Sequence, residues 1–169
     1  NPAGEVQKAH GLGYTARMSV HVEHYKEGMT AYSTGDNAAA VAAFRKALEA
    51  KPEWTEAMHG LATALMHDHK VDEAIEVGKR IAEIDKEDPF VHTSLSIFYQ
   101  RKSYLAEQAK DEPEAKKYIK LAEDEGAKAR LLSWKIELKT NPNAPPHTPP
   151  KPGQPTPPHR VARTHRKSV

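Results

Sequence analysis

The chain has 169 residues, of which 38% are hydrophobic and 28% are charged, and this balance predicts one soluble domain with extensions. No apolar run approaches the ~20 residues that a membrane-spanning helix needs. The absence of cysteine excludes disulfides, thiolate metal sites and cysteine nucleophiles. The net charge of +2 is unevenly spread, because residues 141–169 carry five basic and no acidic side chains. The basic end therefore predicts a functional tail on a mildly acidic body.

The first twenty residues predict an irregular lead-in, because Gly4, Gly11 and Gly13 would interrupt a long helix. The chain begins with Asn1 rather than Met. We therefore expect a protein that is either cytoplasmic or exported after removal of an N-terminal signal.

Two stretches in the middle of the chain repeat each other with a fixed offset. The repeated pairs are Gly28 and Ala62, Gly35 and His69, Asp36 and Lys70, Ala40 and Ala74, Phe44 and Gly78, Ala47 and Ile81, and Pro52 and Lys86. The offset is the same for every pair, and a period of this length is typical of helical solenoids, in which each helix hairpin buries its apolar face only by stacking on a neighbour.

Within this period the pattern predicts two helix hairpins. The expected helices cover residues 22–33, 38–50, 55–67 and 72–84. Asp36 or Asn37 is expected to cap the second of these helices, and Thr55 is expected to cap the third. Lys51 and Pro52 end the second helix, since the residue before a proline disfavours helical geometry.

A third hairpin begins at Pro89, but its period is longer. Asp111 predicts a new helix start, with a proline and a glutamate following in the first turn. If Ala115 is the equivalent of Ala74, the hairpin contains an insertion of about two helical turns. If Ala122 is the equivalent instead, the insertion is twice as long. The sequence leaves both registers open.

Residues 127–139 form another amphipathic pattern, which predicts a helix that caps the last repeat or serves as a fourth half-repeat. This helix either continues the preceding one through Gly126 or starts anew. Nine of the 13 prolines lie in residues 141–169, so this tail is expected to be extended. Pro155, Pro158 and Arg160 form a string that either docks on an aromatic-lined groove or acts as a spacer. The basic residues at 160–167 lack interleaved aromatics, so the nucleic-acid signal is weak.

The repeated pattern resembles the tetratricopeptide repeat family over about residues 21–126. The first unit carries the clearest match, with Gly28, Gly35, Asp36, Ala40, Phe44, Ala47 and Pro52. The resemblance implies an all-α, right-handed solenoid of about three helix hairpins plus a C-terminal capping helix. The expected organisation is a lead-in at 1–20, a repeat domain at 21–140 and a proline-rich tail at 141–169.

In this family the first helix of each hairpin lines a concave groove that binds partners. The resemblance therefore implies a groove made by Tyr25, Met29, Tyr32, Ser33, His59, Thr63, Met66, His67, Thr93, Ile97, Gln100 and Arg101. Such an aromatic and methionine-rich surface suits an apolar or amphipathic peptide. The basic clamp with which some relatives hold a terminal carboxylate is absent, because its positions carry Tyr25, Met29, Gly60, Phe90 and Ser94.

These features predict a protein-protein interaction module that acts as an adaptor or as an accessory subunit of a larger complex. One alternative is a structural subunit that is held by its convex face and its tail. Another is a metal- or anion-responsive module, in which His21 with His24 or His67 with His69 contributes ligands. No arrangement typical of a catalytic site or a cofactor site stands out, so we expect neither an enzyme nor a bound cofactor.

Overall fold

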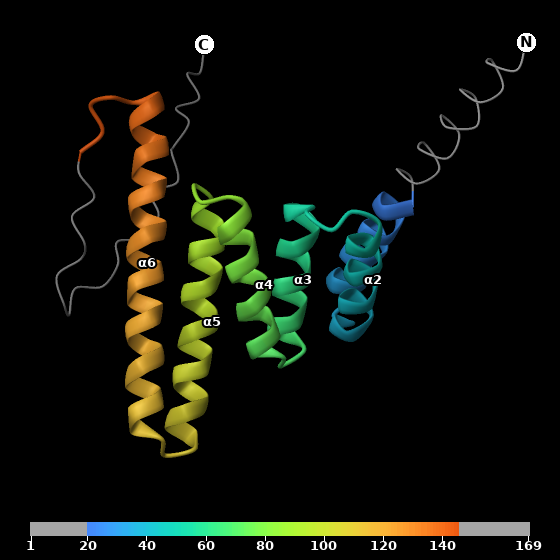
Figure 1. Ribbon diagram of the computed structural model, residues 1–169, viewed down its shortest axis with the longest axis horizontal. Coiled ribbons are helices and arrows are strands. Elements are labelled where there is room, and N and C mark those ends of the chain that lie inside the picture. The colour runs from blue at the N-terminus through green and yellow to red at the C-terminus, as the bar shows by residue number, and fades with distance from the viewer. Residues whose placement is uncertain (1–19, 146–169) are drawn as a thin grey trace, which may run out of the picture.

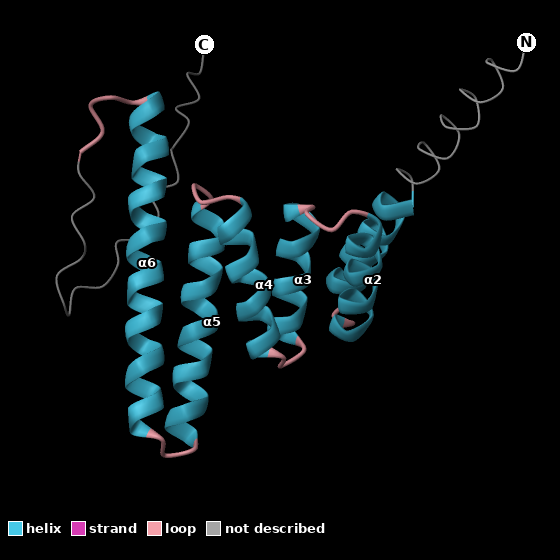
Figure 2. Ribbon diagram, in the orientation of Figure 1, coloured by secondary structure: helices cyan, strands magenta, loops and turns pink. Residues whose placement is uncertain are grey.

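The computed structural model describes residues 20–145, and this part of the chain is helical with no strand (Figure 2). The first helix occupies residues 20–33 and is called the leading helix below. The helices that follow are α2 (Asn37–Ala50), α3 (Thr55–His67), α4 (Val71–Ile84), α5 (Pro89–Gln108) and α6 (Glu112–Thr140). Most of the predicted lead-in, residues 1–19, and the tail from 146 onward lie outside the described residues.

The helices pack in chain order as a row of hairpins (Figure 1). Helix α2 contacts α3, α3 contacts α4, α4 contacts α5, and α5 contacts α6. The leading helix with α2, α3 with α4, and α5 with α6 form the three expected hairpins. The predicted all-α helical-repeat solenoid is therefore confirmed.

Aspartate side chains begin the second helix of the first and third hairpins. Asp36 accepts a hydrogen bond of 3.0 Å from the backbone N–H of Ala39, and Asp111 accepts one of 3.1 Å from Glu114. Both occupy N-cap positions that satisfy an otherwise unpaired N–H. Just before Asp36, Gly35 has a φ of +82°, a conformation that glycine adopts without strain.

Thr55 is not the cap of α3, contrary to the prediction. Helix α3 begins at Thr55 itself, and Trp54 holds the N-cap position without a side-chain hydrogen bond. The indole ring of Trp54 packs 5.0 Å from the ring of His21 and 4.8 Å from that of Tyr25. Aromatic packing therefore fixes the chain before α3 in place of a capping hydroxyl.

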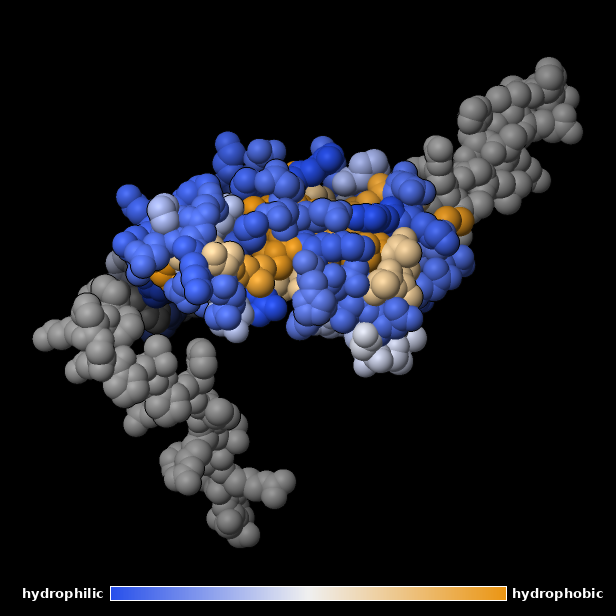
Figure 3. Space-filling model, turned by 90° about the horizontal axis from the view of Figure 1, so that it is seen from below, coloured by the Kyte–Doolittle hydropathy of each residue, from blue (hydrophilic) through white to orange (hydrophobic). Residues whose placement is uncertain are grey.

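Buried apolar side chains from every described helix pair form a core along the array. On the face seen in Figure 3, apolar residues appear along the middle between hydrophilic margins. At the first junction between hairpins, the ring of Phe44 fills the space between Gly28 and Gly60. A Cβ atom added to either glycine would lie 2.7 Å from this ring. At the second junction Gly78 takes the position of Phe44, and a Cβ atom added there would lie 2.8 Å from the side chain of Leu95. The absence of a side chain at Gly78 thus leaves room for Leu95 in the close-packed core.

The third hairpin follows the register with the longer insertion. The hydroxyl of Ser96 donates a hydrogen bond of 2.7 Å to the carbonyl of Ala122, and that of Ser103 donates one of 2.9 Å to Ala115. Ser96 stands one full repeat period after Ala62, so Ala122 is the counterpart of Ala74. Helix α5 has 20 residues against 13 in α3. Helix α6 likewise has a longer stretch before Ala122 than α4 has before Ala74. Relative to α3 and α4, helices α5 and α6 therefore each gain about two turns in this region.

The expected capping helix is the second half of α6, not a separate element. Helix α6 runs through Gly126 for 29 residues without a break. Ala115, Ala122 and Ala129 are buried at seven-residue intervals along it. Beyond Ala129 the helix continues past the start of α5, as Figure 1 shows.

Candidate functional site

The first helices of the three hairpins lie next to one another and present one continuous surface. The ring of Tyr32 on the leading helix lies 5.7 Å from that of His67 on α3. His59 Nε2 on α3 donates a hydrogen bond of 2.7 Å to Asp88, whose carboxylate also caps α5. The outward side of the leading helix, α3 and α5 is called the first-helix face below.

Several of the predicted groove residues serve in packing. Tyr25 is half-buried, with its ring 5.8 Å from that of Phe44 and 4.8 Å from that of Trp54. Tyr32 and Met66 pack against the core, and His59 is engaged with the cap of α5. The hydroxyl of Thr63 is half-buried and donates to the backbone of its own helix.

The remaining predicted residues are largely accessible on the first-helix face. Met29, Ser33, His67, Thr93, Ile97 and Gln100 are exposed, and Arg101 is half-buried. The guanidinium of Arg101 lies 5.4 Å from the centre of the Tyr104 ring, a distance at which a cation and an aromatic face attract each other. Most of the accessible predicted residues therefore lie on α5.

A stripe of exposed apolar side chains runs along α5, and the sequence prediction contained only its middle member. Phe90, Ile97 and Tyr104 are 74%, 50% and 49% exposed, and they are spaced seven residues apart. Seven residues are close to two helical turns, so the three side chains share one side of the helix. This set is called the α5 stripe below. Phe90 is apolar like its buried neighbours, so its residue type did not mark it as exposed. Only its position at the start of the helix, next to the cap, distinguishes it from them.

Three of the histidines singled out as possible metal ligands contact other side chains. His21 packs edge-on against Trp54, His24 lies 2.9 Å from the carboxylate of Glu27, and His67 contacts Tyr32. Within residues 20–145, no three histidine, aspartate or glutamate side chains gather closely enough to hold a metal ion.

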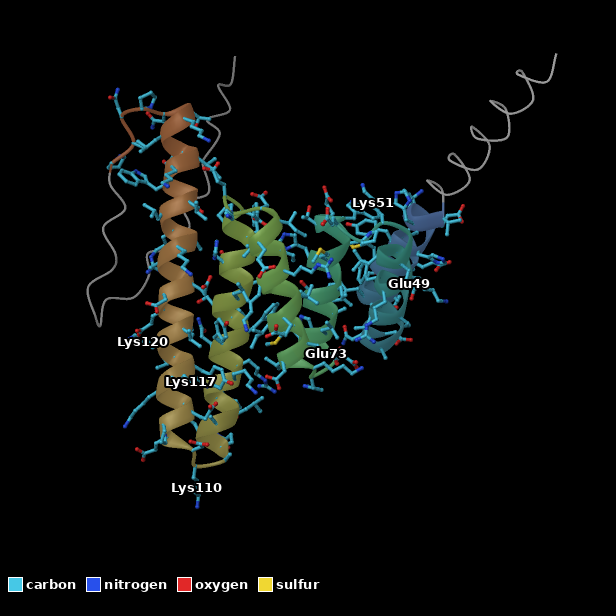
Figure 4. The ribbon with its side chains drawn as sticks, viewed as in Figure 1. Glu49, Lys51, Glu73, Lys110, Lys117 and Lys120 are labelled. Atoms are coloured by element: carbon cyan, nitrogen blue, oxygen red, sulfur yellow. The ribbon has the colours of Figure 1, made fainter. Side chains whose placement is uncertain are left out.

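A second surface feature lies between α4 and α6, where two crevices of about 530 and 540 Å³ share Lys79 and Tyr99. Figure 4 labels Glu73 on α4 and Lys117 on α6, which line the first crevice. The ring of Tyr99 lies 6.1 Å from that of Tyr118, in a stacked arrangement.

Ion pairs occupy the rims of this region. Lys102 lies 2.8 Å from Asp72, and this hydrogen bond raises the pKa of the lysine above its ordinary value. The hydrogen bond to Glu76 likewise raises the pKa of Lys79. Burial raises the pKa of the Tyr99 hydroxyl. The first crevice is therefore lined by charges that already have partners, whereas the α5 stripe is apolar and exposed.

Along the part of the chain that the structure describes, no helix combines the length and the apolarity needed to cross a membrane. Pro155, Pro158 and Arg160, the predicted tail contacts, lie outside that part.

Comparison with known proteins identifies repeats of a known family in the middle of the chain. Residues 25–89 match the family model described as tetratricopeptide repeat. Among solved structures, the chain is similar to a chain of the CopN-Scc3 complex, with 20% identity and a TM-score of 0.49. That likeness covers 70% of this chain and 68% of the other. No curated protein matches the sequence. Residues 25–89 are therefore a tetratricopeptide repeat segment, built from helix hairpins of a kind that serves protein-protein interaction.

Proposed function

We propose that the protein binds an amphipathic helix of a partner protein on its first-helix face, and that the α5 stripe is the main contact. The observation that carries the proposal is the seven-residue spacing of three exposed apolar side chains, Phe90, Ile97 and Tyr104. Large apolar groups that remain in contact with water on one side of a helix are typical of a protein-protein interface.

The spacing favours a helical occupant over an extended one. Side chains seven residues apart along α5 are separated by about 10 Å. A partner helix with apolar residues at the same interval meets all three of them while the two helices run side by side. An extended peptide, in contrast, gains most of its affinity from main-chain hydrogen bonds to a sheet edge.

Polar groups around the stripe supply specificity. His67 and Gln100 are exposed on the same face, and Arg101 is held against Tyr104. A ring of polar side chains around an apolar centre is the common arrangement of protein interfaces. Because the basic clamp for a terminal carboxylate is absent, we infer that the interior of a partner helix, rather than a chain terminus, is recognised.

The test compares two isoleucines of similar exposure. Ile97 lies in the α5 stripe, and Ile119 on α6 is 44% exposed outside it. A partner is first captured from native extract with the full-length chain and identified, and its affinity is then measured by calorimetry. We expect Ile97→Ala to weaken binding about tenfold and Phe90→Ala to weaken it by at least as much, since exposed anchors of an interface cost about 1–2 kcal/mol on truncation.

Ile119→Ala serves as the control and should leave the affinity unchanged. Equal affinities for the Ile97→Ala and wild-type proteins, or equal losses for Ile97→Ala and Ile119→Ala, would overturn the proposal. A loss caused only by substitutions in the α4–α6 crevice, such as Tyr118→Ala, would instead support the alternative of a structural subunit held by its convex side.

A further inference from the structure

The last turns of α6 carry an apolar face, of which Leu131 also borders the crevice shared with α4. Leu131, Trp134 and Leu138 follow one another at intervals of three and four residues, and thus lie on one side of the helix. This side is largely opposite to that of Ala122 and Ala129, which are buried in the third hairpin. Leu131 is 49% exposed, while Trp134 and Leu138 are half-buried. This set is called the Trp134 face below.

Trp134 presents an unusual polar group on this face. Its indole Nε1 is buried, yet it has no hydrogen-bond partner among the residues that the structure describes. A buried donor without an acceptor costs about 1–3 kcal/mol. The face therefore favours an occupant that brings both apolar surface and a free carbonyl oxygen.

The chain itself turns back immediately after this face. The backbone N–H of Ala144 donates a hydrogen bond of 2.9 Å to the carbonyl of Asn141, which closes a turn after the end of α6. Ala144 is buried. Figure 1 shows the described chain leaving the end of α6 on the side away from α5. The described chain therefore ends on the side of α6 that α5 does not cover.

The sequence that follows has the right chemistry for such an occupant. Proline recurs every third residue at Pro146, Pro149, Pro152, Pro155 and Pro158. A polyproline II helix has three residues per turn, so a row with this spacing forms one continuous edge. Proline lacks an N–H but keeps its carbonyl. A segment rich in proline therefore offers rings to pack on the indole and acceptors for its N–H, with few donors of its own that would need partners.

The dimensions also agree. One turn of polyproline II advances about 9 Å, and the stretch of α-helix from Leu131 to Leu138 spans about 10 Å. Two successive prolines of the row can thus contact both ends of the face, with Trp134 between them.

We propose that the Trp134 face is the docking site of the chain's own proline row, and that Pro146 and Pro149 cover the indole. This contact holds the start of the tail along α6 and leaves the basic residues at 160–167 to project from the fold. It does not depend on the α5 stripe or on the function proposed for it.

The test uses two pairs of substitutions that remove the same number of prolines from the same stretch. The pair Pro146→Ser with Pro149→Ser breaks the row, whereas the pair Pro145→Ser with Pro150→Ser leaves it intact. The probe is solvent exchange of the two indole N–H groups in the full-length, ¹⁵N-labelled protein, with the signals of Trp54 and Trp134 assigned from Trp134→Phe. We expect the first pair to accelerate exchange at Trp134 about fivefold or more, as loss of roughly 1 kcal/mol of protection implies.

The second pair should change exchange at Trp134 by less than about twofold, and Trp54 should be unaffected in both proteins. A chain ending at Pro145 should behave like the first pair. Equal exchange in both pairs, or unchanged protection in the shortened chain, would overturn the proposal. Protection that disappears on dilution would assign the Trp134 face to a second copy of the chain, which also contradicts it.

Discussion

Glu125 on α6 carries a largely buried carboxylate that accepts hydrogen bonds from two side chains. His92 Nδ1 on α5 donates to it at 2.5 Å, and Lys128 donates to it at 2.7 Å. Burial alone would raise the pKa of Glu125, but the hydrogen bonds from Lys128 and His92 outweigh it and hold the pKa below its ordinary value of 4.5. Protonation of Glu125 is therefore coupled to unfolding.

The first prediction concerns the pH dependence of stability. Because the folded state lowers the pKa of Glu125, the resulting stabilisation is complete above the unfolded-state value and is lost as the pH falls through the folded-state value. We expect Glu125→Gln to reduce the free energy of unfolding by about 1–2 kcal/mol at pH 7, since it replaces charge-assisted hydrogen bonds by neutral ones. This difference should shrink as the pH falls below 4.5 and should vanish once the pH is below the lowered pKa of folded Glu125. Urea unfolding at several pH values measures both.

The neighbouring Glu123 provides the control, because it is exposed and lies two positions away on α6. Glu123→Gln should change stability by less than about 0.5 kcal/mol at any of these pH values. If the difference in the free energy of unfolding between Glu125→Gln and the wild type did not change with pH, protonation of Glu125 would not be coupled to unfolding.

At the scale of single residues, the sequence predicted the roles that depend on nearby backbone. The capping roles of Asp36 and Asp111 follow from local hydrogen bonding, and both are confirmed. Thr55 failed as a cap because Trp54 is fixed by the rings of His21 and Tyr25, which belong to the first helix of the preceding hairpin. The same contact half-buries the ring of Tyr25. Such contacts are tertiary, so no local pattern predicts them.

The lengthened third hairpin is the element that most distinguishes this chain from a regular repeat. Its two extra turns on α5 and on α6 face each other, and Ser103 bridges to the carbonyl of Ala115. A single sequence leaves the choice between Ala115 and Ala122 open, since a shift of about two full helical turns keeps the same face inward. Only the pairing across α5 decides between them.

The paired lengthening predicts which deletions the fold tolerates. Removal of residues 102–108 together with residues 112–118 takes two turns from each helix, keeps the loop at 109–111 and preserves the pairing of Ser96 with Ala122. We expect this double deletion to remain folded and to keep its helical circular dichroism. Its stability should fall by about 1–3 kcal/mol, because it loses the hydrogen bond of Ser103 and the stacking of Tyr99 on Tyr118.

Deletion of residues 102–108 alone is the control for register. It shortens only α5, so the short loop would have to span an additional distance of about 10 Å. This protein should lose much more stability than the double deletion does. If the single deletion were the better tolerated of the two, the longer register would be wrong.

At the scale of the whole molecule, contacts connect only near neighbours along the chain. Helix α6 contacts α5, whereas α2 contacts α3, and none of the described contacts joins α2 to α6. Stability in such arrays is close to a sum of local terms. The periodic pattern predicted this architecture well, because each hairpin repeats the same few contacts. It did not predict the α5 stripe, since exposure depends on what the neighbouring hairpin leaves uncovered.

Substitution of alanine for glycine at two positions tests whether the hairpins are stabilised by local contacts. In Gly60→Ala the new Cβ would lie 2.7 Å from the ring of Phe44, so the ring must shift and the first junction should lose about 1–2 kcal/mol after allowance for the better helix propensity of alanine. In Gly126→Ala the nearest atoms are 3.3 Å and 3.4 Å away, at the flexible end of Arg130 and at the hydroxyl of Ser96. This site should gain up to about 1 kcal/mol from propensity alone.

Hydrogen exchange followed by mass spectrometry separates the local effects. Gly60→Ala should speed exchange in the leading helix, α2 and α3 while α5 and α6 keep their protection, because α5 packs mainly against α6 and α4. Faster exchange along every described helix would mean that the array unfolds as one cooperative unit. In that case the stripe on α5 would depend on the first junction, and substitutions far from the proposed binding face would weaken partner binding as well.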